Sequence, residues 1–178
     1  TAVPATMAEG RPAHGLGDGR ISCEPCKAVG VVEVQYLEQL FREVAVPYFR
    51  EAHGVVDVTN VRVELANQAD ISNARGRRFI PTSGQDLRAV GLAMKGAARR
   101  LRSATGSEQE RHVVMIESGF SPEATINTLV HELCHVWQYN HLDLETMHPE
   151  LRRLYLEGHA VWTEEKFLNW VGKRELAL

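Results

Sequence analysis

The last third of the chain carries the strongest folding signal, because two segments each begin with residues typical of a helix N-terminus. Ser121 is a good N-cap, and Pro122 follows at the first helical position. We expect a helix from here to about Asn140. A second helix is predicted from Pro149 to about Val171. The short connection between the two segments would let the helices pack antiparallel.

One further helix is predicted nearer the start of the chain. Apolar residues recur at spacings of three and four from about Val32 onward, and Pro47 is expected to kink or end this helix. Residues 1–20 are rich in Gly and Pro and show no hydrophobic period, so a loop or tail is expected there.

Strand signals fill part of the middle of the chain. Alternating apolar residues predict a strand over 56–65, with a turn or bulge at Asn60. Residues 111–117 predict a short strand, which we expect to be the sheet edge along which an extended peptide could lie. Residues 67–86 look loop-like, and 86–103 suit a helix or mixed structure. The expected fold is therefore α+β, with a small, mostly antiparallel sheet packed on helices.

Composition excludes several classes of function. The chain has 178 residues, 44% hydrophobic and 24% charged, which suits one soluble globular domain. The net charge of −3 gives no reason to expect nucleic-acid binding, and the basic runs around Arg75 and Arg99 are interpreted as a solvated face. No apolar run could span a membrane and no signal peptide is recognisable, so a cytoplasmic location is expected. Because the sequence begins at Thr1 rather than Met, a preceding segment could carry targeting information or another domain.

The first C-terminal helix contains His131, Glu132 and His135 in the pattern H-E-x-x-H. Residues four apart lie on one face of a helix, so two imidazoles at this spacing can bind one Zn²⁺ ion. Glu132 lies beside the first ligand, where its carboxylate can act as the general base of a zinc peptidase. The pattern predicts a zincin-type metallopeptidase site.

A catalytic zinc requires a third protein ligand, and Glu157 is the best candidate. It lies on the second helix, beside Gly158, which would allow a close approach of the two helices. Glu164 lies two turns further along the same face and would either accept a hydrogen bond from a zinc-bound His or be solvated. Asn127 is open to the same two interpretations, and His159 is expected to point elsewhere. The other acidic candidates are Glu145, Glu150 and Glu165.

Other residues are harder to assign. Cys134 is expected to be a small buried filler rather than a ligand, and Trp137 and Trp162 are expected in the core. Cys23 and Cys26 are either two thiols in a loop or part of a zinc module. A donor for the oxyanion is needed, and the sequence leaves five candidates, which are Tyr139, His141, His148, Tyr155 and His159.

The C-terminal residues resemble gluzincin peptidases and are most similar to the peptidase domain of the DA-one family. That family consists of plant growth-restricting, ubiquitin-activated metallopeptidases whose catalytic domain follows LIM zinc modules. The similarity rests on HELCHVW at 131–137 and LEGHAVW at 156–162. It implies a zincin-like fold with a metallopeptidase domain over 27–178, and residues 1–26 as a tail or the remnant of a zinc module. It also implies an activity linked to ubiquitin.

The sequence thus predicts a zinc-dependent peptidase that hydrolyses peptide bonds in protein substrates, with ubiquitin or ubiquitin-linked proteins among the expected partners. The alternative is a non-catalytic, zinc-containing regulatory or protein-binding module. Glu132 argues against that alternative, because a structural zinc site needs no general base. A SprT-like protease acting on DNA-bound protein would suit the cysteine pair but neither the net charge nor a Glu157 ligand.

Overall fold

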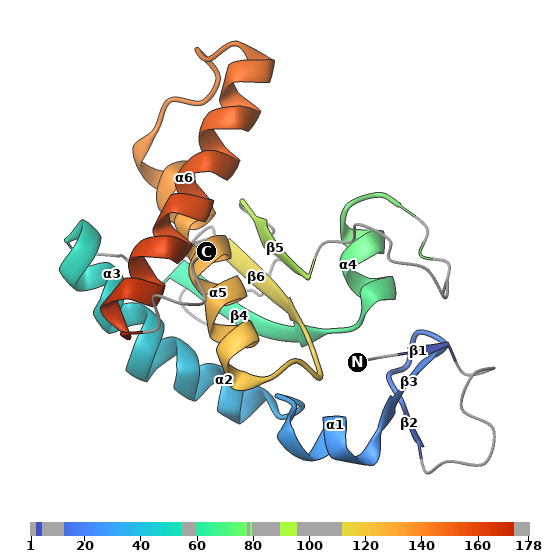
Figure 1. The fold of residues 1–178 in the computed structure, drawn as a ribbon. Helices are drawn as coiled ribbons and strands as arrows, with labels where there is room; N and C mark the ends of the chain where they lie inside the picture. Colours follow the sequence, from blue (N-terminus) through green and yellow to red (C-terminus); the bar gives the residue numbers. More distant parts are fainter. Residues whose placement is uncertain are drawn as a thin grey trace, which may run out of the picture.

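The computed structural model of the chain describes residues 3–4, 13–54, 60–77, 79, 90–95 and 112–172. The fold is α+β, as predicted. A three-stranded sheet lies against helix α5 (Pro122–His141), and helix α6 (Pro149–Trp170) returns alongside α5 (Figure 1). Both C-terminal helices begin and end within a residue or two of their predicted bounds. No helix in the described parts of the chain has the length and apolar character needed to cross a bilayer.

The central sheet consists of β4 (Val61–Ala66), β5 (Gly91–Met94) and β6 (His112–Glu117) in the order β4-β6-β5. Strand β6 is parallel to β4 and antiparallel to β5, so this sheet is mixed rather than mostly antiparallel. The expectation that 111–117 forms an edge was wrong, because β6 is paired on both sides. The edge beside α5 is β5. Strand order depends on pairings between distant segments, which the local pattern of one strand does not contain.

Helix α4 (Gln68–Ala74) occupies part of the segment expected to be a loop. Its N-terminus is a capping box, in which the Asn67 side chain accepts from the N–H of Asp70 at 2.9 Å and Asp70 accepts from the N–H of Asn67 at 3.4 Å. These two residues satisfy N–H groups that the first turn of a helix otherwise leaves without partners. The three-residue spacing of Asn67 and Asp70 is the sequence signal of such a capping box, which sequence reasoning missed.

Residues on the two faces of β6 belong to different apolar clusters. Val114 and Ile116 are fully buried in the main core, together with Leu129 of α5. Met115 points to the other face, where it packs with Ile71 of α4. The sheet is therefore covered by α5 on one face and by α4 on the other.

The N-terminal helix continues through the proline that was expected to kink or end it. It comprises α2 (Val34–Leu40), a π-helical segment η2 (Phe41–Ala45) and α3 (Val46–His53). The N–H of Val46 bonds to the carbonyl of Phe41, five residues back, so the chain gains one residue in this turn. Pro47 then falls in the first turn of α3, where a missing N–H is tolerated.

The first part of the chain forms strands where a loop was expected. The elements are β1 (Val3–Pro4), β2 (Ala13–Gly15), β3 (Arg20–Cys23) and the short helix α1 (Glu24–Val29). The strands pair antiparallel in the order β1-β3-β2. Arg20, 3% exposed, pairs with Asp18 and with Glu117 at the end of β6, each at 2.6 Å. The buried ion pair between Arg20 and Glu117 links the N-terminal sheet to the central sheet.

Some expectations lie outside the described residues. They concern the start of the 56–65 strand, the end of the 67–86 loop and most of 86–103. Within the last segment, the described residues 90–95 contain strand β5 and no helix.

Candidate metal centre and its cleft

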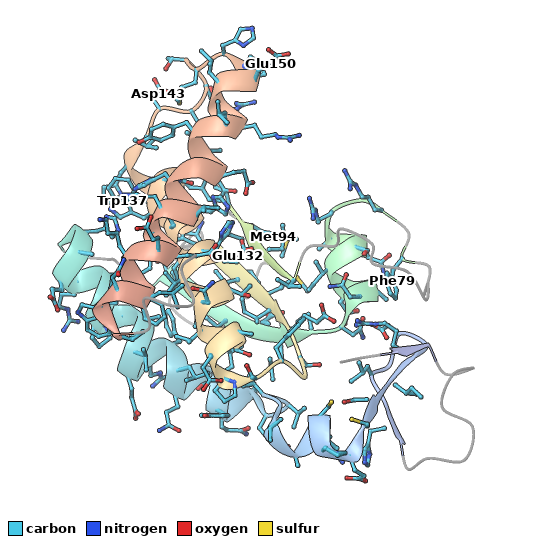
Figure 2. The ribbon with its side chains drawn as sticks, in the orientation of Figure 1. Phe79, Met94, Glu132, Trp137, Asp143 and Glu150 are labelled. Carbon is cyan, nitrogen blue, oxygen red and sulfur yellow. The ribbon has the colours of Figure 1, made fainter. Side chains whose placement is uncertain are left out.

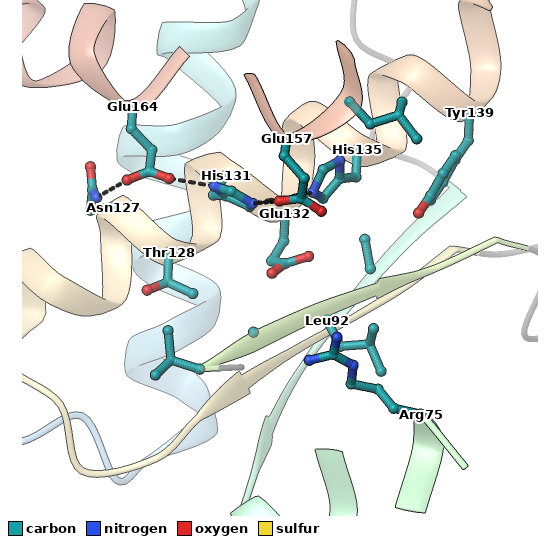
Figure 3. Close-up of a pocket in the computed structure, with 14 residues that line it drawn as sticks. Arg75, Leu92, Asn127, Thr128, His131, Glu132, His135, Tyr139, Glu157 and Glu164 are labelled. Carbon is teal, nitrogen blue, oxygen red and sulfur yellow. Dashed lines mark hydrogen bonds and ion pairs between the residues drawn. The ribbon is translucent and has the colours of Figure 1, made fainter. Parts of the chain in front are cut away.

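Helix α5 places two histidine rings against each other. The helix begins as predicted, with the Ser121 hydroxyl accepting from the N–H of Ala124 at 3.3 Å. His131 and His135 follow one turn apart, and their Nε2 atoms lie 3.1 Å from each other. Both rings point toward the same cleft, as Figure 3 shows.

Helix α6 brings Glu157 to the same point. Its Oε2 atom lies 3.5 Å from Nε2 of His131 and 4.0 Å from Nε2 of His135. Two ligand atoms of a tetrahedral zinc ion, each at about 2.0–2.2 Å from the metal, lie about 3.3–3.6 Å apart. The three separations in this structure, 3.1, 3.5 and 4.0 Å, bracket that range, so these side chains could hold a single ion of this size. Among the described residues, no other His, Cys, Asp and Glu side chains form such a group.

The Nδ1 atom of each histidine ring also contacts a neighbouring side chain. Nδ1 of His131 contacts a carboxylate oxygen of Glu164, whose other oxygen accepts from the amide of Asn127 at 2.5 Å (Figure 3). Nδ1 of His135 lies 2.8 Å from Oε1 of Gln138. These contacts orient the rings so that both Nε2 atoms face the cleft. Glu164 therefore makes the expected contact with a histidine of the group, whereas Asn127 contacts Glu164 and not the ring.

Sequence reasoning missed Gln138. This side chain is fully buried, and its amide also donates to the carbonyl of Leu156 at 2.9 Å, which ties His135 to helix α6. The available signal was its position three residues after His135, on the same face of the helix.

The two rings differ in their electrostatic surroundings. Burial lowers the pKa of His131, but the hydrogen bond to Glu164 and the charge of Glu132 outweigh it, so the net shift is upward. The pKa of His135 is lowered, because burial and the charge of His131 outweigh its hydrogen bond to Gln138. The carboxylates that favour a proton on His131 also favour a metal cation beside it.

Glu132 lies at the floor of the cleft, directly against strand β5. Burial raises the pKa of its carboxyl to about 7, although His131 and the backbone N–H of Ala93 lower it in part. A Cβ atom at Gly91 would lie 2.7 Å from both Oε1 of Glu132 and Cγ2 of Thr128. Gly91 therefore lets the edge strand approach the Glu132 carboxylate as closely as it does.

The cleft has a volume of about 520 Å³ and is lined by residues of β5, α5 and α6 and by Arg75, which directly follows α4. Of the five candidate donors for an oxyanion, all of which the structure describes, Tyr139 alone lines it. Arg75, interpreted from the sequence as part of a solvated face, also lines it. The polar lining consists of Arg75, Asn127, Thr128, His131, Glu132, His135, Tyr139, Glu157 and Glu164.

His159 and Cys134 do not line the cleft. Nδ1 of His159 is 3.2 Å from the amide of Gln138 and 3.7 Å from the sulfur of Cys134. Cys134 is fully buried in the core and accepts from the hydroxyl of Thr163 at 3.4 Å. Both residues are placed as the sequence predicted.

Two predictions about the outer surface of α6 were wrong. Trp162 is 48% exposed rather than in the core, with the Lys166 amine 5.3 Å from its ring centre. Gly158 faces open space and does not mediate the contact with α5, which includes Gln138 with Leu156 and Cys134 with Thr163. Trp137 is partly buried against the core (Figure 2). Spacing alone could not show which of the two apolar sides of α6 faces inward.

Cys23 and Cys26 are both thiols at the start of α1, and the N–H of Cys26 donates to the sulfur of Cys23 at 3.4 Å. His14, the nearest histidine in the sequence, contacts Glu24 and Lys27. The interpretation of residues 1–26 as the remnant of a zinc module stays a prediction.

Comparison of the chain with known protein families, with curated proteins and with solved structures finds no match.

Proposed function

We propose that this chain is a zincin-like, zinc-dependent peptidase that hydrolyses peptide bonds in protein substrates. The observation that carries the proposal is the convergence of His131, His135 and Glu157, with the Glu132 carboxyl buried beside them. Two nitrogen ligands and one carboxylate are the ligand set of one class of catalytic zinc sites. The proposed resemblance to gluzincins rests on the same residues.

In this proposal His131, His135 and Glu157 hold the metal, and Glu164 and Gln138 hold the two rings in place. The chemistry supplied by a bound zinc ion is activation of a water molecule and polarisation of the peptide carbonyl.

Glu132 would accept the proton from the attacking water and pass it to the leaving amine. Its burial supports this role, since a base with a pKa near 7 can both take and return a proton at neutral pH. Gly91 allows the substrate-facing strand to lie against it.

The substrate would lie along β5. This strand pairs with β6 on one side only, so in the described part of the sheet its other edge is available for main-chain hydrogen bonds. Tyr139 would donate to the oxyanion, because it alone of the candidate donors lines the cleft. Tyr139→Phe should then lower kcat by about 10²–10³-fold, the usual cost of losing one such donor.

The experiment combines metal analysis with a cleavage assay. We expect about one zinc per chain, and cleavage of proteins in a cell lysate that stops on chelation and returns with zinc. Glu132→Gln should keep the zinc and the fold but remove turnover, because an amide cannot accept the proton. Glu145→Gln, an exposed change in the connection between α5 and α6, is the matched control.

The non-catalytic alternative predicts a different result. A protein-binding or regulatory module would retain zinc but produce no new termini in the lysate, and Glu132→Gln would change nothing. Sequencing the new termini with and without added ubiquitin also tests whether ubiquitin is a substrate or an activator, which the resemblance implies.

A further inference from the structure

Arg75 is held at a fixed point on the wall of the cleft opposite the metal-binding residues. Helix α4 ends at Ala74, and the N–H of Arg75 bonds to the carbonyls of Ile71 and Ser72 at 3.1 Å each. Gly76 then takes a left-handed conformation, with φ of +69°, which ends the helix. The side chain therefore starts from an ordered helix terminus.

The guanidinium points from this terminus toward the cleft. Figure 3 shows it beside Leu92, across strand β5 from Glu132 and the two histidines. The residue is exposed, so a ligand in the cleft could reach it from solvent. Within the described part of the chain, no side chain forms an ion pair or hydrogen bond with the guanidinium.

The charges in the cleft give Arg75 a distinct position. Of the three carboxylates that line it, Glu164 contacts His131 and Asn127, Glu157 belongs to the ligand group, and Glu132 is buried. Among the described lining residues, Arg75 is the one side chain that carries a permanent positive charge. An anionic group entering the cleft would meet this guanidinium.

We propose that Arg75 forms an anion subsite that binds a carboxylate of the peptide substrate, so that the cleft selects acidic peptides. This inference rests on the proposed peptidase function. A guanidinium suits the task, because its planar donors match a carboxylate bidentately. The carboxylate belongs either to an Asp or Glu side chain or to the free C-terminus of the peptide, and the two sources can be separated.

The probe is a library of synthetic decapeptides in matched forms. At each position in turn the residue is fixed as Glu or Gln, and the C-terminus is free or amidated. Wild-type protein loaded with zinc is compared with Arg75→Ala and with Arg77→Ala. Arg77 is a matched control, because it is an exposed neighbour that does not line the cleft.

We expect Arg75→Ala to lower kcat/KM for acidic peptides by about 10–100-fold, the range for a hydrogen bond to a charged group. The lower kcat/KM should come mainly from a higher KM. For the peptides with Gln or an amidated C-terminus, kcat/KM should change by less than about threefold. A Glu preference at one position that survives amidation identifies a side-chain carboxylate. A preference for free C-termini, with cleavage at a constant distance from the end, identifies the terminal carboxylate.

Charge reversal gives an independent readout that does not depend on losing activity. With a third set of peptides that carry Lys at the fixed position, Arg75→Glu should prefer Lys where wild type prefers Glu.

Three results would overturn the proposal. Arg75→Ala could behave like Arg77→Ala on every peptide, or it could lower kcat equally for acidic and neutral peptides, which would indicate oxyanion stabilisation instead. If zinc-loaded wild type cleaves no peptide, the proposed function itself fails and the subsite falls with it. The first two results leave the peptidase function standing.

Discussion

Replacing Glu157 with alanine tests the ligand set directly. Glu157 is more than half exposed, with 59% of its side chain accessible, and within the described part of the chain it forms ion pairs with His131 and His135 alone. Alanine favours helix, so the fold should survive the change. The effect should therefore appear in metal affinity and not in the stability of the metal-free protein.

The magnitude follows from comparison with Glu164. Glu164 contacts Nδ1 of His131 and the amide of Asn127, and loss of such an orienting partner costs about 10–100-fold in metal affinity. Glu157 would be a direct ligand, so Glu157→Ala should exceed that range, corresponding to more than about 2.7 kcal/mol. Glu165→Ala is the matched control, because Glu165 is exposed on the same helix and does not line the cleft.

The assay is competition for zinc against a chromophoric chelator at pH 7, with melting of each metal-free variant as the check on folding. We expect the largest loss of zinc affinity in Glu157→Ala, a smaller loss in Glu164→Ala and almost none in Glu165→Ala. If Glu157→Ala bound zinc like wild type while Glu164→Ala lost it, the ligand set would be wrong. The gluzincin resemblance would then lose its main support.

Three further changes test neighbouring parts of the site and the fold. Gly91→Ala should displace the Glu132 carboxylate and lower kcat by about 100-fold, the cost of a misplacement near 1 Å, with zinc content unchanged; unchanged kcat would show that the strand simply moves aside. Gln138→Met should weaken zinc binding about 10–100-fold by releasing the His135 ring, and equal affinity would contradict its orienting role. His53 has a lowered pKa, because burial and nearby histidines disfavour its charged form, and its Nε2 finds no hydrogen bond among the described residues. Its neutral form contributes stability above pH 6.5, and this stability is lost as the pH falls. The melting temperature of His53→Phe should therefore fall less than that of wild type between pH 7 and pH 5. An equal fall would show that His53 does not cause the pH dependence of stability.

Local patterns were sufficient where the signal lies within one helix. Ser121 and Pro122 define the start of α5 through groups only a few residues away, and the prediction of this helix is confirmed. The relation between His131 and His135 follows from helical geometry alone, because four residues make about one turn. The same reasoning could have found the capping box of α4 and the position of Gln138.

The tertiary structure decided whatever depends on two segments meeting. The neighbours of β6, and so the identity of the edge strand, depend on pairing with β4 and β5 from elsewhere in the chain. The proximity of Glu157 to the histidines was proposed from the sequence, but Glu145, Glu150, Glu164 and Glu165 were competing candidates until α6 was placed on α5.

Arg75 shows the same limit most clearly. Its sequence neighbourhood is a run of arginines, which is typical of a solvated surface. What brings it to the cleft is α4 lying on the face of the sheet opposite α5, with β5 between them. A sequence determines what a residue can do chemically and which way it turns within its own helix or strand. Which distant groups it faces is settled by the packing of those elements, since burial of their apolar faces selects one arrangement of the whole chain.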